Sequence, residues 1–249
     1  MCVNPSAKHK IKSEALITLL LLMSLLGVFP LDVILPSFLA LGTQFSVETT
    51  QVALSVSLFA LGVAAAPLVI GRLSDKIGRK RLLLMGILAS IAGAIGCVLS
   101  SHYSMFIGFR VLQALGCGCF VLTQALVQDL FEGKQRNALR ILQTSASGFF
   151  ISLSPLAGSW LQQAFDWQGS FITFAFIACI VLLMCLFWLE SDIHRVDVKI
   201  DFLASYSSIC RDRAFMAYST IAALAFACHF SFIVASPLLF MDGLGLSTY

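Results

Sequence analysis

The sequence predicts an all-α membrane protein that crosses the bilayer several times. Apolar residues make up 59% of its 249 positions and charged residues only 12%, whereas an average soluble domain is about half apolar and a quarter charged. A bilayer core about 30 Å thick needs about 20 apolar residues in a helix. Seven runs meet this requirement: 15–38, 52–70, 82–100, 104–128, 138–162, 171–189 and 214–240.

The distribution of Lys and Arg predicts the orientation, because cytoplasmic loops retain these residues. With the N-terminus inside, fifteen of the sixteen basic residues fall on the cytoplasmic side, and the sixteenth, Arg110, lies within a span. Tyr103, Trp160 and Trp167 then fall at outer helix ends, where interfacial aromatics are common. We therefore expect a multi-pass protein with a cytoplasmic N-terminus.

Four segments follow from this topology. Residues 1–14 form a cytoplasmic N-terminus and residues 15–189 a six-helix unit. Residues 190–213, which mix acidic and basic side chains, form a cytoplasmic linker, and residues 214–249 contain a seventh helix. The connections are otherwise too short for a soluble domain.

Several functional classes are disfavoured. The net charge of +3 is small, and the basic residues lie in short loops, which argues against a nucleic-acid partner. The sequence has no H-E-x-x-H or G-x-S-x-G stretch, so we expect no enzyme. The pair Cys117 and Cys119 has the wrong spacing for common zinc motifs, and we interpret both as small packing residues. No metal and no cofactor are expected.

Two charges lie inside predicted spans, Asp32 in the first and Arg110 in the fourth. Counting about 1.5 Å per residue from the outer helix ends places both about 8–10 Å below the external surface, so a direct ion pair is possible. On a regular helix, Arg110 shares an arc of about 60° with four other residues, which gives a mostly polar stripe. The four are Gln113, Cys117, Gln124 and Gln128.

These residues allow two interpretations. In one, Asp32 and Arg110 form a permanent buried ion pair, and the glutamines bond neighbouring helices. In the other, they line a cavity in which Asp32 carries a proton, because charged groups in a membrane are usually functional and Arg itself does not deprotonate.

The stretch from Gly71 to Arg81 is the most specific in the chain. It reads Gly-Arg-Leu-Ser-Asp-Lys-Ile-Gly-Arg-Lys-Arg and contains Gly71, Asp75, Gly78 and Arg79 at fixed spacing. It resembles the signature loop between helices two and three of the major facilitator superfamily. In that family the loop latches the two halves of the transporter in the outward-facing state, and Asp129 matches a position that joins its charge network.

Three other stretches resemble motifs of drug:proton antiporters in this superfamily. Residues 32–36 resemble the helix-one motif, and residues 110–116 resemble the helix-four motif, whose Arg is implicated in proton transfer. Gly148, Pro155 and Gly158 resemble the helix-five motif, although Ser154 and Ser159 replace two of its glycines. Together the motifs resemble the bicyclomycin- and chloramphenicol-resistance branch.

The resemblance implies a six-helix N-terminal bundle of the major facilitator fold, built from two inverted three-helix repeats. It also implies a proton-coupled efflux transporter of the bacterial inner membrane that works by alternating access. Its partners would be protons, the lipid bilayer and an amphipathic, drug-like small molecule. Asp32, Arg110, Gln113 and Gln124 would serve coupling and line the cavity.

The number of spans is unusual for this architecture, because superfamily members have two six-helix halves. We expect the chain to be the N-terminal portion of such a transporter, with five helices missing. Two alternatives remain: a truncated membrane protein that does not transport but acts as an interaction partner, and a half-transporter that works as a homodimer.

Overall fold

The computed structural model describes residues 5–189 and 211–237, and all regular structure in these ranges is helical. The elements are α1 (Pro5–Asp32), η1 (Leu35–Ser37), α2 (Phe38–Phe45), α3 (Thr49–Ile77), α4 (Arg79–Val98), α5 (Tyr103–Cys117), η2 (Gly118–Val121), α6 (Leu122–Leu130), α7 (Gly133–Phe165), α8 (Gln168–Trp188) and α10 (Arg213–Pro237). The chain divides into two compact units, Met1–Arg195 and Val196–Tyr249. The all-α membrane fold is therefore confirmed.

Six helical stretches of the described residues are long and apolar enough to cross a membrane, where the sequence predicts seven spans. They are Glu14–Phe45, Thr49–Gly71, Arg79–Val98, Tyr103–Leu130, Gln168–Trp188 and Arg213–Phe232. The predicted span 138–162 is also helical, since it lies within the 33 residues of α7. Its mean hydropathy is too low for it to count among the six, because polar and small residues such as Gln143, Thr144 and Ser152 interrupt its apolar sequence.

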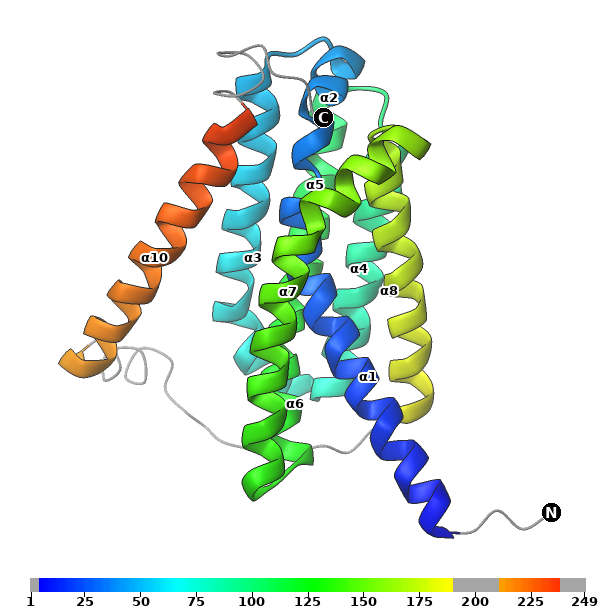
Figure 1. The fold of residues 1–249 in the computed structure, drawn as a ribbon, viewed down its shortest axis with the longest axis vertical. Coiled ribbons are helices and arrows are strands. Elements are labelled where there is room, and N and C mark those ends of the chain that lie inside the picture. The colour runs from blue at the N-terminus through cyan, green and yellow to red at the C-terminus, as the bar shows by residue number, and fades with distance from the viewer. Residues whose placement is uncertain (1–4, 190–210, 238–249) are drawn as a thin grey trace. The chain divides into compact units, whose positions relative to one another are not determined.

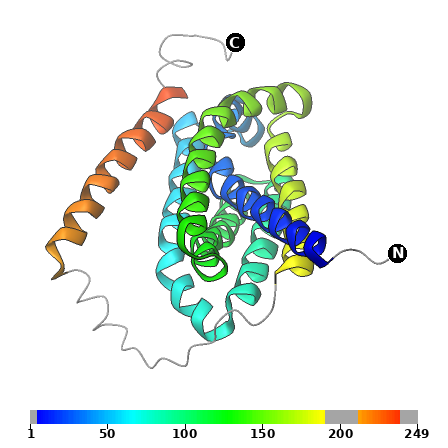
Figure 2. The same ribbon diagram turned by 60° about the horizontal axis from the view of Figure 1, so that its bottom comes forward.

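Within the first unit, α4 packs against both α5 and α8, while α1 packs against α7 and α8. Figures 1 and 2 show α1 crossing close to α7, with α4 and α8 side by side. The helix α3 completes the bundle by packing on α5. The core between these helices is apolar, with fully buried side chains that include Met23, Leu26, Phe59, Leu83 and Phe174.

Small residues allow the close approach of α4 and α5. A Cβ added to Gly93 would lie 2.5 Å from the backbone nitrogen of Gln113, and one added to Gly116 would lie 2.4 Å from that of Ser90. A Cβ on Gly86 would lie 2.3 Å from the Sγ of Cys119. Gly86, Ser90 and Gly93 lie at helical spacing on α4 and form a stripe of small residues. This stripe is a packing surface, and Cys119 packs on it.

Two predicted spans are not single regular helices. The first breaks after Asp32, where Pro30 and Pro36 flank a short irregular segment before α2, because proline removes a backbone donor and crowds the preceding turn. The fourth contains the 3₁₀ segment η2 between α5 and α6. The first break directly follows Asp32, and the second lies between Gln113 and Gln124.

In the second unit, α10 begins after Asp212, whose Oδ1 accepts hydrogen bonds from the backbone N–H groups of Ala214 (2.9 Å) and Phe215 (3.3 Å). A short polar side chain at this position is a typical helix N-cap. Most of the predicted linker 190–213 and the segment 238–249 lie outside the described residues, so the predicted segment boundaries remain predictions.

Candidate functional site

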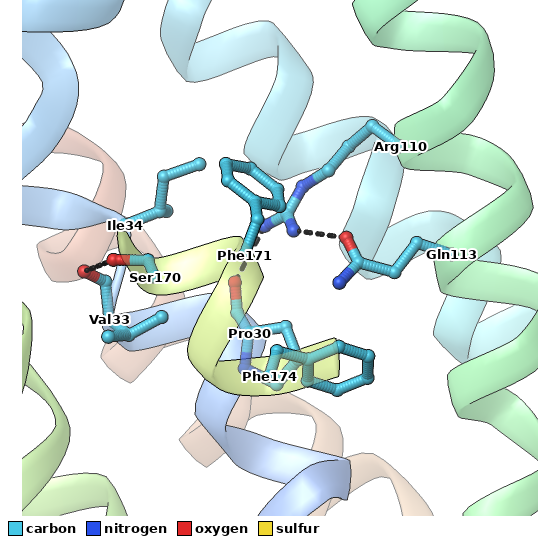
Figure 3. Close-up of a pocket in the computed structure, with 8 residues that line it drawn as sticks. All are labelled: Pro30, Val33, Ile34, Arg110, Gln113, Ser170, Phe171 and Phe174. Atoms are coloured by element: carbon cyan, nitrogen blue, oxygen red, sulfur yellow. Dashed lines mark hydrogen bonds between the residues drawn. The ribbon is translucent and has the colours of Figure 1, made fainter. Parts of the chain in front are cut away.

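Arg110 lies at the centre of the first unit. Its side chain is 1% exposed and reaches from α5 toward the end of α1, as Figure 3 shows. One guanidinium nitrogen donates to the main-chain carbonyl of Pro30 (2.6 Å), and the other donates to Oε1 of Gln113 (2.7 Å). A buried guanidinium needs such partners, because an unpaired charge in an apolar interior is costly.

Two aromatic rings also face this guanidinium. Its central carbon lies 4.0 Å from the ring centroid of Phe59 on α3 and 5.4 Å from that of Phe171 on α8. Both distances fall within the range of cation–π attraction. An enclosed void of about 10 Å³ lies beside the group and is lined by Pro30, Val33, Ile34, Arg110, Gln113, Ser170, Phe171 and Phe174.

Asp32 is buried, with 4% exposure, at the last residue of α1. Since Arg110 bonds the Pro30 carbonyl two residues earlier, the acid and the guanidinium belong to the same region of the bundle. A direct ion pair between Asp32 and Arg110 stays a prediction. The arrangement provides a buried acid and a fixed cation on two different helices.

The predicted polar stripe of the fourth span is wrong as one continuous face. Gln113 and Cys117 are buried beside Arg110, whereas Gln124 and Gln128 are exposed. A 3₁₀ helix advances about 120° per residue rather than 100°, so η2 rotates α6 relative to α5. The stripe divides into a buried part around Arg110 and an exposed part on α6.

Gln124 lies instead on a cleft of about 280 Å³. We call this the four-helix cleft, since its lining comes from α1, α3, the η2–α6 segment with the end of α5, and α7. The lining residues are Met23, Ser24, Gly27, Val28, Val63, Pro67, Cys117, Gly118, Phe120, Val121, Thr123, Gln124 and Ser147. The lining is mostly apolar, with a few hydroxyl and amide groups and no charged side chain, which suits a largely apolar small molecule.

The α3–α4 connection differs in part from the predicted loop. Gly71 lies inside α3 rather than in a turn, and Asp75 is exposed in the last turn of that helix. Gly78 alone separates α3 from α4, with φ of +98°, a conformation that glycine adopts without steric cost. Arg79 forms an ion pair with Asp129 on α6, in agreement with the predicted charge network, and also donates to the Ala125 carbonyl (3.0 Å).

The three predicted motif residues of α7 lie in different surroundings. Gly158 is buried, and an added Cβ there would lie 2.3 Å from the Val33 carbonyl oxygen. Pro155 is half-buried inside the helix. Gly148 is exposed, and a Cβ there would meet nothing within 4 Å in the described part of the chain. Only Gly158 therefore acts as a packing residue against the end of the first span.

A cluster of aromatic rings beside Arg110 is absent from the sequence prediction. Rings of Phe45, Phe106, Trp167 and Phe171 lie 5.2–6.2 Å from one another in five contacting pairs. Trp167, predicted at an outer helix end, directly precedes α8 and is 2% exposed, so its ring packs inside the bundle rather than on its surface. Its ring is buried because it packs on Phe45 of α2 and Phe106 of α5. No local sequence pattern near Trp167 predicts this packing.

Comparison with known proteins decides the family. A family model described as Major Facilitator Superfamily matches residues 17–249. The chain belongs to this superfamily. The match begins within α1 and includes all the later helices, and it agrees with the motif between α3 and α4.

Among curated relatives, the multidrug resistance protein MdtL of Shigella dysenteriae serotype 1 (strain Sd197) is 26% identical over 216 residues, covering 86% of this chain and 55% of that protein. MdtL of Escherichia coli O157:H7 matches with the same identity and coverage. The chain thus spans about half the length of the curated relatives it matches.

Solved structures agree on the fold. A peptide transporter, POT, in complex with sulfate has a TM-score of 0.65 at 14% identity, with 89% of this chain and 46% of that chain covered. The human organic anion transporter MFSD10 has a TM-score of 0.53 at 19% identity, with 72% and 48% covered. Both solved proteins are named as transporters. At these low identities the similarity supports the predicted fold and nothing more specific.

Proposed function

We propose that this chain forms the N-terminal half of a proton-coupled efflux transporter for amphipathic small molecules, working by alternating access. The observation that carries the proposal is a mostly apolar four-helix cleft in the same bundle as a buried acid, Asp32, and a buried guanidinium, Arg110. Cys117 lines the cleft two turns along α5 from Arg110, so a change at the charged group reaches the cleft through one helix.

Two further features support the proposal. The Arg79–Asp129 pair joins α4 to α6 beside Gly78, in the stretch that resembles the family's latch loop. The matched relatives are named multidrug resistance proteins. We place the chain in the bacterial inner membrane with its N-terminus in the cytoplasm, because this orientation puts nearly all basic residues on one side.

The test is drug-driven proton movement. The reading frame that contains this chain is expressed, inverted membrane vesicles are acidified, and a panel of amphipathic compounds is added while the internal pH is followed. We expect at least one compound to release protons, and Asp32→Asn to reduce the release about tenfold or more, because the acid carries the proton. Glu48→Gln, which neutralises an exposed carboxylate, is the control and should transport normally.

Normal proton release by the Asp32→Asn protein would overturn the coupling role of Asp32, and no compound-dependent release by the unmodified protein would overturn the proposed function. The 249-residue chain expressed alone gives a separate comparison. Its coverage of about half of each relative favours the alternative that this chain alone does not transport, and export above the empty-vector level would exclude that alternative.

A further inference from the structure

We propose that Phe59 and Phe171 are positioning residues that hold the Arg110 guanidinium by cation–π attraction. The part of this proposal that concerns transport rests on the proposed function above, whereas the part that concerns attraction does not. Phe59 belongs to none of the motifs described above.

The hydrogen bonds of Arg110 leave room for such an attraction. A guanidinium has five N–H donors, and the bonds to Pro30 and Gln113 use two of its nitrogens. Nε of Arg110 and Nε2 of Gln113 are buried without a hydrogen-bond partner in the described residues. Hydrogen bonds therefore do not saturate this buried cation, and the ring faces provide additional negative potential.

The two rings reach Arg110 from different parts of the bundle. Phe59 is fully buried on α3, and Phe171 is 3% exposed on α8. Phe171 also contacts Phe106 at 5.8 Å and Trp167 at 6.0 Å between ring centroids, so the aromatic cluster fixes its plane. Arg110 and Phe171 belong to the second predicted three-helix repeat and Phe59 to the first, so only the Phe59 contact joins the two predicted repeats.

Phe174 provides a matched control. It lies one helical turn after Phe171 on α8, is 1% exposed and lines the same void. Figure 3 draws its ring away from the Arg110 guanidinium, past Pro30, and the cation–π contacts of Arg110 in the described residues are those with Phe59 and Phe171. A change in ring electrostatics at Phe174 therefore changes a buried ring of the same kind without changing the attraction for Arg110.

The experiment substitutes mono-, di- and trifluorophenylalanine at positions 59, 171 and 174. Added fluorines withdraw charge from the ring face while nearly preserving its size, so they weaken cation–π attraction stepwise. In detergent, thermal unfolding of the 249-residue chain should show a progressive decrease at Phe59 of about 2–4 °C overall. We expect a smaller decrease at Phe171 and none at Phe174.

An Arg110→Met background completes the cycle. In this background, fluorines at Phe59 should not change the unfolding temperature. An equal decrease in unfolding temperature with and without Arg110 would overturn the proposed cation–π attraction. If the Arg110→Met chain does not fold, the test is the comparison of Phe59 with Phe174. An equal decrease in unfolding temperature per added fluorine at these two positions would overturn the proposal.

A transport measurement distinguishes a positioning role of the two rings from a purely structural role. In the full reading frame, trifluorophenylalanine at Phe59 should lower turnover about tenfold, with KM changed less than about twofold because Phe59 does not line the four-helix cleft. Unchanged turnover alongside lowered unfolding temperatures would reduce the rings to a structural role. Absence of transport in the unmodified protein would count against the proposed function, while the unfolding series still tests the attraction.

Discussion

The helices α5 and α7 both carry antiporter-like motifs, but they use their glycines differently. On α5, Gly116 lies against α4 so closely that a Cβ would lie within 2.5 Å of two backbone atoms. On α7, Gly158 lies equally close to the Val33 carbonyl, whereas Gly148 meets no neighbour in the described part of the chain. Membership of a motif therefore does not define a residue's role, because some motif glycines pack the bundle and others leave a helix face open.

The largest expected effect tests the packing of α5. Gly116→Ala should lower the free energy of unfolding by about 3 kcal/mol, because its Cβ would overlap backbone atoms of Ser90 and Gly86, which cannot move without displacing α4. Gly108→Ala is the control on the same helix, since its Cβ would meet nothing within 4 Å in the described residues. Denaturant unfolding of the purified chain in detergent measures both.

For Gly108→Ala we expect no loss, and a gain of up to about 1 kcal/mol from the higher helix propensity of alanine. Equal stability of the two variants would mean that α4 and α5 separate easily. The motif glycine of α5 would then not be more important for packing than the exposed glycine of α7.

An intermediate effect tests α7. Gly158→Ala should lower the free energy of unfolding by about 1–2 kcal/mol, because its Cβ would push on the irregular segment that follows Asp32. Gly148→Ala should be neutral or slightly stabilising for the reason given for Gly108. The same unfolding assay applies, and a loss at Gly148 as large as that at Gly158 would show that Gly148 is also a packing residue.

The smallest effect concerns the ion pair at the end of α6. Asp129→Asn should cost about 0.5–1 kcal/mol, because the side chains of Arg79 and Asp129 are 18% and 14% exposed and are partly screened by water. Glu132→Gln, which removes an exposed acid three residues later, is the control and should change stability less. A loss above about 3 kcal/mol at Asp129 would mean that the pair behaves as a buried one.

The sequence predicts the helices and a charge network that joins Asp129 to the α3–α4 connection, because each depends on a local pattern or a fixed motif. Apolar runs define the spans, and the spacing around Gly78 defines the connection between α3 and α4. The close packing at Gly86 and Gly93 also follows a local pattern, because small residues at helical spacing indicate close packing.

The surroundings of Arg110 were predicted only in part. The polar stripe extended across η2 as if the helix were regular, and no local signal marks a 3₁₀ segment at 118–121. Phe59 and Phe171 are separated from Arg110 by 51 and 61 positions in the chain, and phenylalanine is common in any membrane helix. Their placement depends on how four helices pack, which composition and periodicity do not specify.

The single-residue connection at Gly78 makes the chain intolerant of length changes at this point. One inserted residue would turn the start of α4 by about 100° about its axis and would carry Arg79 to another side of the helix. The neighbouring Lys80, which donates to the Leu186 carbonyl at 3.2 Å, would lose its partner as well. An insertion or deletion at this connection should therefore disturb the packing of α3 and α4 more than a substitution beside it.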